Sequence, residues 1–187
     1  MGRPHPTIEL PGRHPTLLAL LDSVGADPFG VCDEFRRGCR GEPVAAGHVC
    51  VTNWVVDLDA GAVLLVWHDR LGWASCGGHV AAGEDPFVAA RRELLEETGL
   101  SAEAVQAVQR PLFVHRTEVG GASGALPWDH MHWNIAYGWT AGGLPALVGE
   151  AGAPARWFPI GSLPEKRPAD TDAGIAAVVA AAREATG

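Results

Sequence analysis

Three glutamates near one end of a predicted helix are the residues best suited to chemistry: Glu93, Glu96 and Glu97. Positions three and four apart share a helix face, where like charges repel by roughly 0.2–0.5 kcal/mol per pair. Glu96 and Glu97 also lie near the negative end of the helix dipole, which adds a further small cost. Two interpretations follow: a solvated acidic face softened by Arg91 and Arg92, or a set of hard oxygen ligands for Mg²⁺ or Mn²⁺.

The helix that carries these carboxylates is predicted from Pro86 to Thr98. Asp85 suits the N-cap, proline is accepted at the first helical position, and Gly99 is placed to end the helix. The preceding segment, LGWASCGGH, is predicted to be a glycine-bearing loop. Its Gly77 and Gly78 permit tight backbone geometry, so a carbonyl oxygen can turn inward as a further oxygen ligand.

The rest of the main domain predicts strands alternating with helices and long loops. Runs rich in β-branched and aromatic residues indicate strands, and glycines and prolines mark the turns. The pattern favours an α/β fold in which a mixed sheet lies between helices. The predicted strands are His48–Asp57, Ala62–Trp67, about Val105 to Glu118, about His130 to Thr140, and ARWFPI; a turn at Asp59–Gly61 joins the first two, GGASGALPWD is a loop, and Asp170 caps a final helix, AGIAAVVAAAREA.

Residues 1–45 are predicted to form a tail and a helical extension outside the main domain. Residues 1–13 are a loose tail, and PTLLALLDSV after His14 is a short helix. Asp27 followed by Pro28 indicates the start of a second helix that runs toward Arg37. The extension could cover a sheet edge, join a homodimer interface or cap a pocket, and the sequence does not distinguish these roles.

Composition excludes several classes of protein. Of 187 residues, 47% are hydrophobic and 19% charged, which is enough apolar side chain for a packed core. The net charge of −8 argues against a nucleic-acid polymer as partner, because such binders need a basic face. No apolar run approaches a signal peptide or the roughly 20 residues of a membrane span, so a cytoplasmic location without membrane association is expected. The four cysteines lack CxxC spacing and are expected to be reduced and packed.

The segment Gly77–Leu100 resembles the Nudix box, G-x5-E-x7-R-E-U-x-E-E-x-G-U, in which U is a bulky aliphatic residue. Every spacing agrees, which makes the resemblance highly specific. The likeness extends over roughly residues 45 to 186 and implies a Nudix-type α/β/α sandwich with a mixed central sheet for residues 46–187. The matching residues are Gly78, Glu84, Arg92, Glu93, Leu94, Glu96, Glu97, Gly99 and Leu100.

This resemblance implies an enzyme that hydrolyses a pyrophosphate bond in a nucleoside diphosphate linked to another moiety, with Mg²⁺ or Mn²⁺ as cofactor. Arg92 would hold the glutamates in position, and Glu84 would support the site. The catalytic residues that the resemblance implies are Glu93, Glu97 and Arg92. The metal ligands that it implies are Glu93, Glu96, Glu97 and the Gly78 carbonyl oxygen.

The general base stays open on the sequence. The family draws it either from the box helix or from a later loop. Glu93 is the first candidate, and Glu118 and Glu150 are the acidic residues best placed in later loops, either as the base or as substrate contacts.

Three histidines are candidates for substrate contact. His130 and His132 alternate along a predicted strand and therefore share one face. His79 directly follows the glycines of the box. The other histidines considered are expected to be structural, and single tryptophans pack in cores more often than they stack on a nucleobase. These residues are His48, His68 and His115, and Trp67, Trp73, Trp128 and Trp133.

Two positions depart from a subgroup that the flanking segments resemble. Cys76 stands where W-x-x-P-G-G-H has proline, and Asn134 replaces the aspartate of H-x-H-x-D-x-x-F/Y. Two other functions are alternatives on the same fold. One is a catalytically silent domain that senses nucleotides, and the other is an isoprenyl diphosphate isomerase that would use a cysteine such as Cys76. The complete box argues against both.

Overall fold

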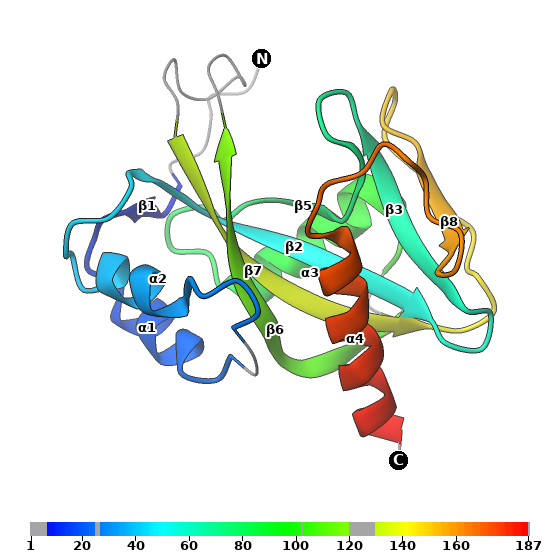
Figure 1. Ribbon diagram of the computed structural model, residues 1–187, viewed down its shortest axis with the longest axis horizontal. Coiled ribbons are helices and arrows are strands. Elements are labelled where there is room, and N and C mark those ends of the chain that lie inside the picture. Colours follow the sequence, from blue (N-terminus) through cyan, green and yellow to red (C-terminus); the bar gives the residue numbers. More distant parts are fainter. Residues whose placement is uncertain (1–6, 25–26, 102, 120–129, 187) are drawn as a thin grey trace.

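A mixed sheet forms the middle layer of the computed structural model, with helices on both of its faces (Figure 1). The structure describes residues 7–24, 27–101, 103–119 and 130–186. Within them the strand order is β4-β3-β2-β7-β6, with β1 and β5 paired to β2 and β8 paired to β3. The predicted α/β sandwich with a helical N-terminal extension is confirmed. In chain order the elements are β1 (Glu9–Leu10), α1 (Pro15–Leu21), α2 (Cys32–Cys39), β2 (Gly47–Asp57), β3 (Ala62–His68), β4 (Gly72–Ala74), β5 (Cys76–His79), α3 (Pro86–Thr98), β6 (Val105–Val119), β7 (His130–Ala141), β8 (Ala155–Pro159) and α4 (Thr171–Thr186).

Strand β2 lies at the centre of the sheet. It pairs in parallel with β7, from Gly47 opposite Met131 to Val56 opposite Thr140. On its other side, residues 50–53 pair antiparallel with β5 and residues 55–57 pair antiparallel with β3. Because β2 has neighbours on both sides, its register fixes where the side chains of β5 and β7 stand relative to one another.

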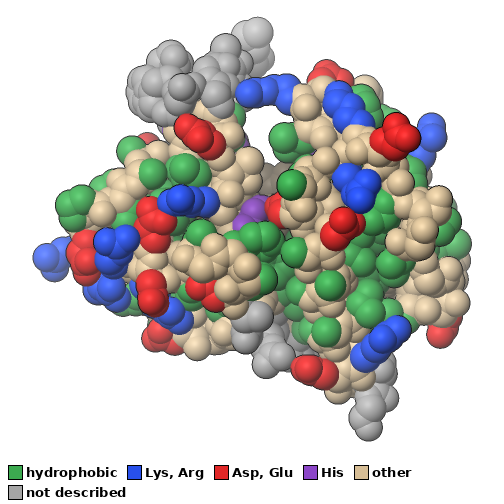
Figure 2. Space-filling view, in the orientation of Figure 1, with side chains coloured by type: hydrophobic (Ala, Val, Ile, Leu, Met, Phe, Trp, Pro, Cys, Tyr) green, Lys and Arg blue, Asp and Glu red, His purple; other side chains and the backbone are tan. Residues whose placement is uncertain are grey.

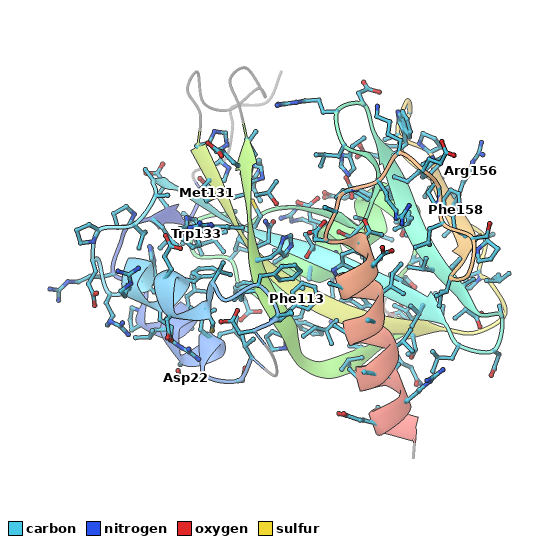
Figure 3. The ribbon with its side chains drawn as sticks, viewed as in Figure 1. Asp22, Phe113, Met131, Trp133, Arg156 and Phe158 are labelled. Atoms are coloured by element: carbon cyan, nitrogen blue, oxygen red, sulfur yellow. The ribbon has the colours of Figure 1, made fainter. Side chains whose placement is uncertain are left out.

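Alternate positions of β2 enter two separate apolar cores, because successive strand residues point to opposite faces. Val49 and Val51 pack in the core that α1, α2 and α3 cover, whereas Trp54 packs in the core beside α4. Figure 3 shows Trp133 on the side of α2 and Phe113 near α4. On the α4 side, Cys50 and Thr52 of β2 are not covered by a helix and line a cavity.

Helix α3 has the ends that the sequence predicts. The Asp85 carboxylate accepts hydrogen bonds from the N–H groups of Phe87 at 2.8 Å and Val88 at 3.2 Å. Gly99 ends the helix with a left-handed φ of 72°, which glycine adopts without the steric cost of a Cβ atom. Both ends of the helix that carries the acidic residues are therefore set by local sequence.

The fully buried Asn53 ties α3 to the sheet. Its amide nitrogen donates to the Ala90 carbonyl oxygen at 3.0 Å, and its amide oxygen accepts from the Trp139 indole N–H at 2.8 Å. A buried amide needs such partners to offset the loss of water. These bonds fix the position of α3 over β2 and β7.

The N-terminal extension packs directly on the sheet. Strand β1 pairs with the start of β2, and Phe35 of α2 packs on Trp133 with ring centroids 5.4 Å apart. Phe29 and Val31, which precede α2, line the cavity on the α4 side of the sheet. The extension thus both covers part of the sheet and forms a wall of the cavity.

The predicted start of the second helix is wrong. Helix α2 begins at Cys32, four positions after Pro28, because Gly30 adopts a left-handed φ of 65° that interrupts helical geometry. The Asp27 carboxylate still accepts hydrogen bonds from the N–H groups of Val31 and Cys32. Asp27 therefore caps this helix from a preceding turn and not as its adjoining residue.

The segment LGWASCGGH, predicted as a loop, contains the two short strands β4 and β5. The ladders that they form with β3 and β2 override the low strand propensity of glycine. The other predicted strands begin and end within one residue of their observed ends. The predicted loop GGASGALPWD comprises residues 120–129, which lie outside the described residues.

Two expectations from composition can be compared with the structure. All four cysteines are buried and free of disulfides, which confirms the prediction of packed thiols. Among the helices of the described residues, none combines the length and the apolar character that a membrane crossing needs.

Candidate active site

The side chain of Arg92 joins the acidic residues of the box into one network. Its guanidinium makes two parallel contacts with Glu84, 2.9 Å from Nε to Oε1 and 3.0 Å from Nη2 to Oε2. Nη1 lies 2.6 Å from Glu93 Oε1 and 3.3 Å from Glu96 Oε2, and Nη2 also donates to the His79 carbonyl oxygen at 3.0 Å. The planar fork of arginine suits such bidentate pairing. Arg92 thereby links the loop before α3 to two of its carboxylates.

Gly78 leaves room for the Glu93 carboxylate. A methyl group added at Gly78 would lie 2.5 Å from the Glu93 Cδ atom, far closer than carbon atoms approach without displacement. Burial raises the pKa of Glu93 above its ordinary value, and the charge and hydrogen bond of Arg92 oppose that rise. The carboxylate is thus held half-buried against the backbone of β5.

Glu97 is held from the same strand. Its Oε2 accepts a hydrogen bond from the Gly77 N–H at 2.8 Å. Burial raises the pKa of Glu97 to about 7; the Gly77 N–H opposes the rise, whereas the charges of Glu93, Glu150 and Glu96 add to it. Glu150, in a later loop, is exposed. Its negative charge contributes to the raised pKa of Glu97, so Glu150 lies on the same side of the molecule as Glu97.

The carboxylates of Glu93, Glu96 and Glu97, called the box carboxylates below, supply the donor type that a hard divalent cation takes, although their oxygen atoms do not all lie within 4.8 Å of one another. All three lie on neighbouring turns of one helix, and their oxygen atoms are the donors that Mg²⁺ and Mn²⁺ prefer. Burial raises the pKa values of Glu93 and Glu97, so their charged forms are disfavoured relative to water. A bound cation would remove that cost.

A cavity of about 1030 Å³ lies beside the box. Its floor is formed by β5, β2, β7 and β6, and its walls include the segments before α2 and α4. Figure 2 shows histidine surface, in purple, near the centre of this face of the molecule. The box reaches the cavity through Gly77, Gly78 and His79, whereas the box carboxylates are not part of the lining.

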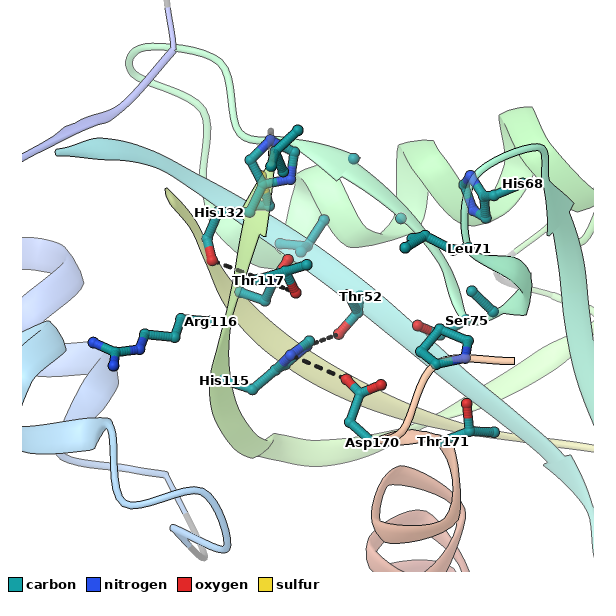
Figure 4. A pocket seen from close by; sticks show the side chains of 18 of the residues that line it. Thr52, His68, Leu71, Ser75, His115, Arg116, Thr117, His132, Asp170 and Thr171 are labelled. Atoms are coloured by element: carbon teal, nitrogen blue, oxygen red, sulfur yellow. Dashed lines mark hydrogen bonds and ion pairs between the residues drawn. The ribbon is translucent and has the colours of Figure 1, made fainter. Parts of the chain in front are cut away.

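His115 stands on the cavity floor between two polar partners (Figure 4). Its Nδ1 lies 3.2 Å from Asp170 Oδ2, and its Nε2 lies 3.5 Å from Thr52 Oγ1. Burial lowers the pKa of His115, and the Asp170 charge acts in the opposite direction. Asp170, predicted only as a cap of the final helix, therefore also directs its carboxylate to the cavity.

The predicted substrate contacts are divided between the cavity and its surroundings. His79, His132 and Glu118 line the cavity. His130 Nε2 lies 3.1 Å from His132 Nε2, which confirms that these two histidines share a face. Glu150 lies outside the cavity lining, on the side of the box carboxylates.

Sequence reasoning missed several residues of the cavity. His68 and His115 were expected to be structural, yet both line it, and so does Cys50. His48 is buried, and its ring centroid lies 4.3 Å from that of His79. Burial lowers the pKa of His48 to about 4. The available signal was the alternation of His48 and Cys50 along one predicted strand.

Trp67, Trp73, Trp133 and Cys76 lie outside the cavity lining. Trp67 packs edge-on against Trp73, and Trp133 is fully buried. Trp128 lies outside the described residues. Cys76 is also fully buried, and burial raises the pKa of its thiol well above the ordinary value, so Cys76 is a neutral packed thiol.

The family follows from a comparison with known domains. The NUDIX domain model matches residues 47–182, which is more than half of the chain. The chain therefore belongs to the NUDIX family and is a Nudix hydrolase. A comparison with curated proteins finds no match.

Solved structures of the same fold include three hydrolases. A NUDIX-family hydrolase from Clostridium perfringens is 21% identical with a TM-score of 0.53, over 73% of this chain and 97% of that one. The dihydroneopterin triphosphate pyrophosphohydrolase of E. coli is 17% identical with a TM-score of 0.53, over 70% and 91%. The Ap4A hydrolase of C. elegans is 16% identical with a TM-score of 0.50, over 74% and 98%. At these identities the likeness shows the fold alone.

Proposed function

We propose that this protein hydrolyses a pyrophosphate bond in a nucleoside diphosphate linked to another moiety, with Mg²⁺ or Mn²⁺ as cofactor. The observation that carries the proposal is that the Glu97 carboxylate accepts from the Gly77 N–H and the Glu93 carboxylate lies against Gly78, beside a cavity that both glycines line. Two proteins of the same fold bear the names dihydroneopterin triphosphate pyrophosphohydrolase and Ap4A hydrolase, and these names point to phosphate anhydrides as the substrate class.

In this proposal the box carboxylates hold the cation together with the Gly78 carbonyl oxygen. When bound, the cation would neutralise charge on the phosphate oxygens and lower the pKa of an attacking water. Arg92 keeps Glu93 and Glu96 oriented through its contacts, and Glu84 anchors Arg92. The box residues therefore act as one preorganised unit.

The proton acceptor is proposed among three glutamates. Glu93 is the first candidate, because it lies on the box helix against Gly78 and burial raises the pKa of its carboxyl. Glu150 lies near enough to Glu97 to raise the pKa of that carboxyl. Glu118 stands on the cavity lining and is exposed.

The cavity is proposed to bind the nucleoside part of the substrate. Its volume of about 1030 Å³ is at the upper end of small-molecule sites. Phe29 and Leu71 give it apolar surface, and His115 and Asp170 give it polar surface. The negative net charge of −8 agrees with a small-molecule partner, not a nucleic-acid polymer.

We also propose a division of roles between two parts of the chain. We assign hydrolysis to residues 46–187 and assign to residues 1–45 the shaping of the cavity, where Phe29 and Val31 contribute. Association into a homodimer and a cytoplasmic location stay predictions. Light scattering of the purified protein measures the first, and imaging of a tagged chain in its host measures the second.

A substrate panel tests the proposed reaction. The purified protein is assayed with dinucleoside polyphosphates, nucleotide sugars and nucleoside triphosphates, in Mg²⁺, Mn²⁺ or EDTA, and products are resolved by chromatography. We expect release of a nucleoside monophosphate or phosphate that requires the cation and is absent from an identically purified Glu97→Gln protein. Tight nucleotide binding without turnover in any cation would overturn the proposal in favour of a silent sensor domain.

A further inference from the structure

Four side chains with nitrogen and sulfur donors converge on the cavity side of the sheet. They are His48 and Cys50 of β2, His79 of β5 and His132 of β7, and their donor atoms all lie within 4.8 Å of one another. We call this group the His–Cys cluster. Within the described residues it is the one group of histidines, cysteines and acids with metal-ligand spacing, and it shares no residue with the box carboxylates.

The register of three strands produces the cluster. His48 stands opposite His132 across the parallel ladder of β2 and β7. Cys50 stands opposite His79 across the antiparallel ladder of β2 and β5. Because His48 and Cys50 are two apart on one strand, both pairs face the same side of the sheet. Backbone ladders therefore hold the four donors before any ion binds.

The cluster is buried and incompletely hydrogen-bonded. His48 is 2% exposed and Cys50 is 3% exposed, and His79 and His132 are half-buried. The Nε2 atoms of His48 and His79 are buried without a hydrogen-bond partner. A buried polar atom left unpaired costs about 1–3 kcal/mol, so two such atoms in one group call for a ligand.

The donor types select the ligand class. Three imidazoles and one thiol are the donors that Zn²⁺ takes in tetrahedral sites, whereas Mg²⁺ and Mn²⁺ prefer oxygen. Metal–ligand distances of about 2.0–2.3 Å place tetrahedral donors roughly 3.3–3.8 Å apart. Side-chain rotations on the fixed strands can close the present spacing of up to 4.8 Å. His130, with Nε2 3.1 Å from that of His132, adds a neighbouring imidazole able to orient a ligand.

We propose that His48, Cys50, His79 and His132 form a zinc site with a structural role, distinct from the proposed site of the box carboxylates. Four protein ligands leave no open position, as in structural zinc sites. The ion would join β5 to β2 and β7. Since the His79 carbonyl oxygen accepts from Arg92 at 3.0 Å, and Gly78 adjoins His79, the same ion would steady the strand that supports the box.

Metal analysis of protein purified from zinc-supplemented cells tests the proposal. We expect about one zinc per chain in the wild type and less than about 0.2 in Cys50→Ser and His132→Ala. Cys39→Ser is the matched control, because Cys39 is equally buried but lies in α2 outside the cluster. Glu97→Gln separates the two sites and should retain the zinc, whatever its hydrolytic activity.

Cobalt substitution gives a readout that does not depend on the variants. Co²⁺ added to zinc-free wild-type protein should give a thiolate-to-cobalt charge-transfer band and the visible spectrum of a tetrahedral site, and Zn²⁺ should bleach both. Absence of zinc and of the thiolate band in the wild type would overturn the proposal. So would zinc that is lost in Glu97→Gln and retained in Cys50→Ser, because that result would assign it to the box carboxylates.

Discussion

The box carboxylates and the His–Cys cluster lie on either side of the same short strand, β5, and offer different donor atoms. Gly78 of β5 adjoins the Glu93 carboxylate, while the next residue, His79, joins the cluster on the cavity floor. Successive strand residues face opposite sides, so one strand supports both regions. Hard oxygen donors favour Mg²⁺ or Mn²⁺ on one side, and imidazole and thiol donors favour Zn²⁺ on the other.

The two regions also differ in how they depend on electrostatics. The box carboxylates are mutually repulsive acids; Arg92 holds Glu93 and Glu96, the Gly77 N–H holds Glu97, and burial raises the pKa values of Glu93 and Glu97. The His–Cys cluster carries no formal charge when its imidazoles are neutral and its thiol is protonated. Substitutions in the box should therefore change cation binding and turnover, and substitutions in the cluster should change zinc content and the rigidity of β5.

Glu93→Gln is expected to have the largest effect on turnover. The substitution keeps the size of the side chain but removes the charge that a cation needs and the first candidate for the base. We expect kcat to fall by about 10³-fold, a loss of several kcal/mol of transition-state stabilisation. Glu103→Gln, an exposed glutamate shortly after the same helix, is the control. Wild-type kcat in Glu93→Gln would contradict the assigned role.

Gly78→Ala should separate geometry from charge. The added methyl group would displace the Glu93 carboxylate without changing any ionisable group. Since displacement by about 1 Å can cost 10²-fold in rate, we expect about that loss in kcat with circular dichroism unchanged. Gly142→Ala is the matched control, because nothing lies within 4 Å of its added methyl group. Equal kcat in both variants would show that the Gly78–Glu93 approach is not needed.

Arg92→Lys should have a smaller effect. Lysine retains the positive charge but lacks the planar fork that contacts Glu84, Glu93 and Glu96 together. Loss of a residue that orients metal ligands typically costs about 10- to 100-fold, so we expect kcat/KM to fall within that range. Zinc content should not change. A variant with unaltered kcat/KM at every Mg²⁺ concentration would rule out the orienting role.

The smallest effect concerns stability in the absence of metal. Because the folded-state pKa of Glu97 is about 7, above the ordinary value of 4.5, the folded chain binds the proton more tightly than the unfolded chain. This contribution to stability is present below about pH 4.5 and is lost as pH rises through about 7. In EDTA, Glu97→Gln should therefore gain Tm relative to the wild type between about pH 5 and pH 8, by a few degrees. A difference in Tm between the two proteins that stays constant across this pH range would contradict the raised pKa of Glu97.

The sequence was sufficient for the box because its parts are local. Asp85, Pro86 and Gly99 specify both ends of α3, and the acidic spacing within it is readable directly. The wrong predictions concern structure that depends on distant residues or on an unusual backbone conformation. Strands β4 and β5 depend on ladders with distant partners, and the late start of α2 depends on the left-handed Gly30.

The His–Cys cluster could not be predicted in the same way. His48 and His132 are far apart in the chain, and only the parallel register of β2 and β7 places them opposite each other. A shift of one residue in that register would point one of them to the other face. The alternation of His48 with Cys50, and of His130 with His132, was visible, but nothing in the sequence relates the two strands.

Calorimetric titration of Mn²⁺ tests the central claim most directly, that the box carboxylates bind a divalent cation. The titration uses Cys50→Ser protein, so that the His–Cys cluster contributes less, and the same protein with Glu97→Gln added. We predict saturable binding in the first and an affinity at least about tenfold weaker in the second. Identical isotherms in the two proteins, or no binding in the first, would contradict the account.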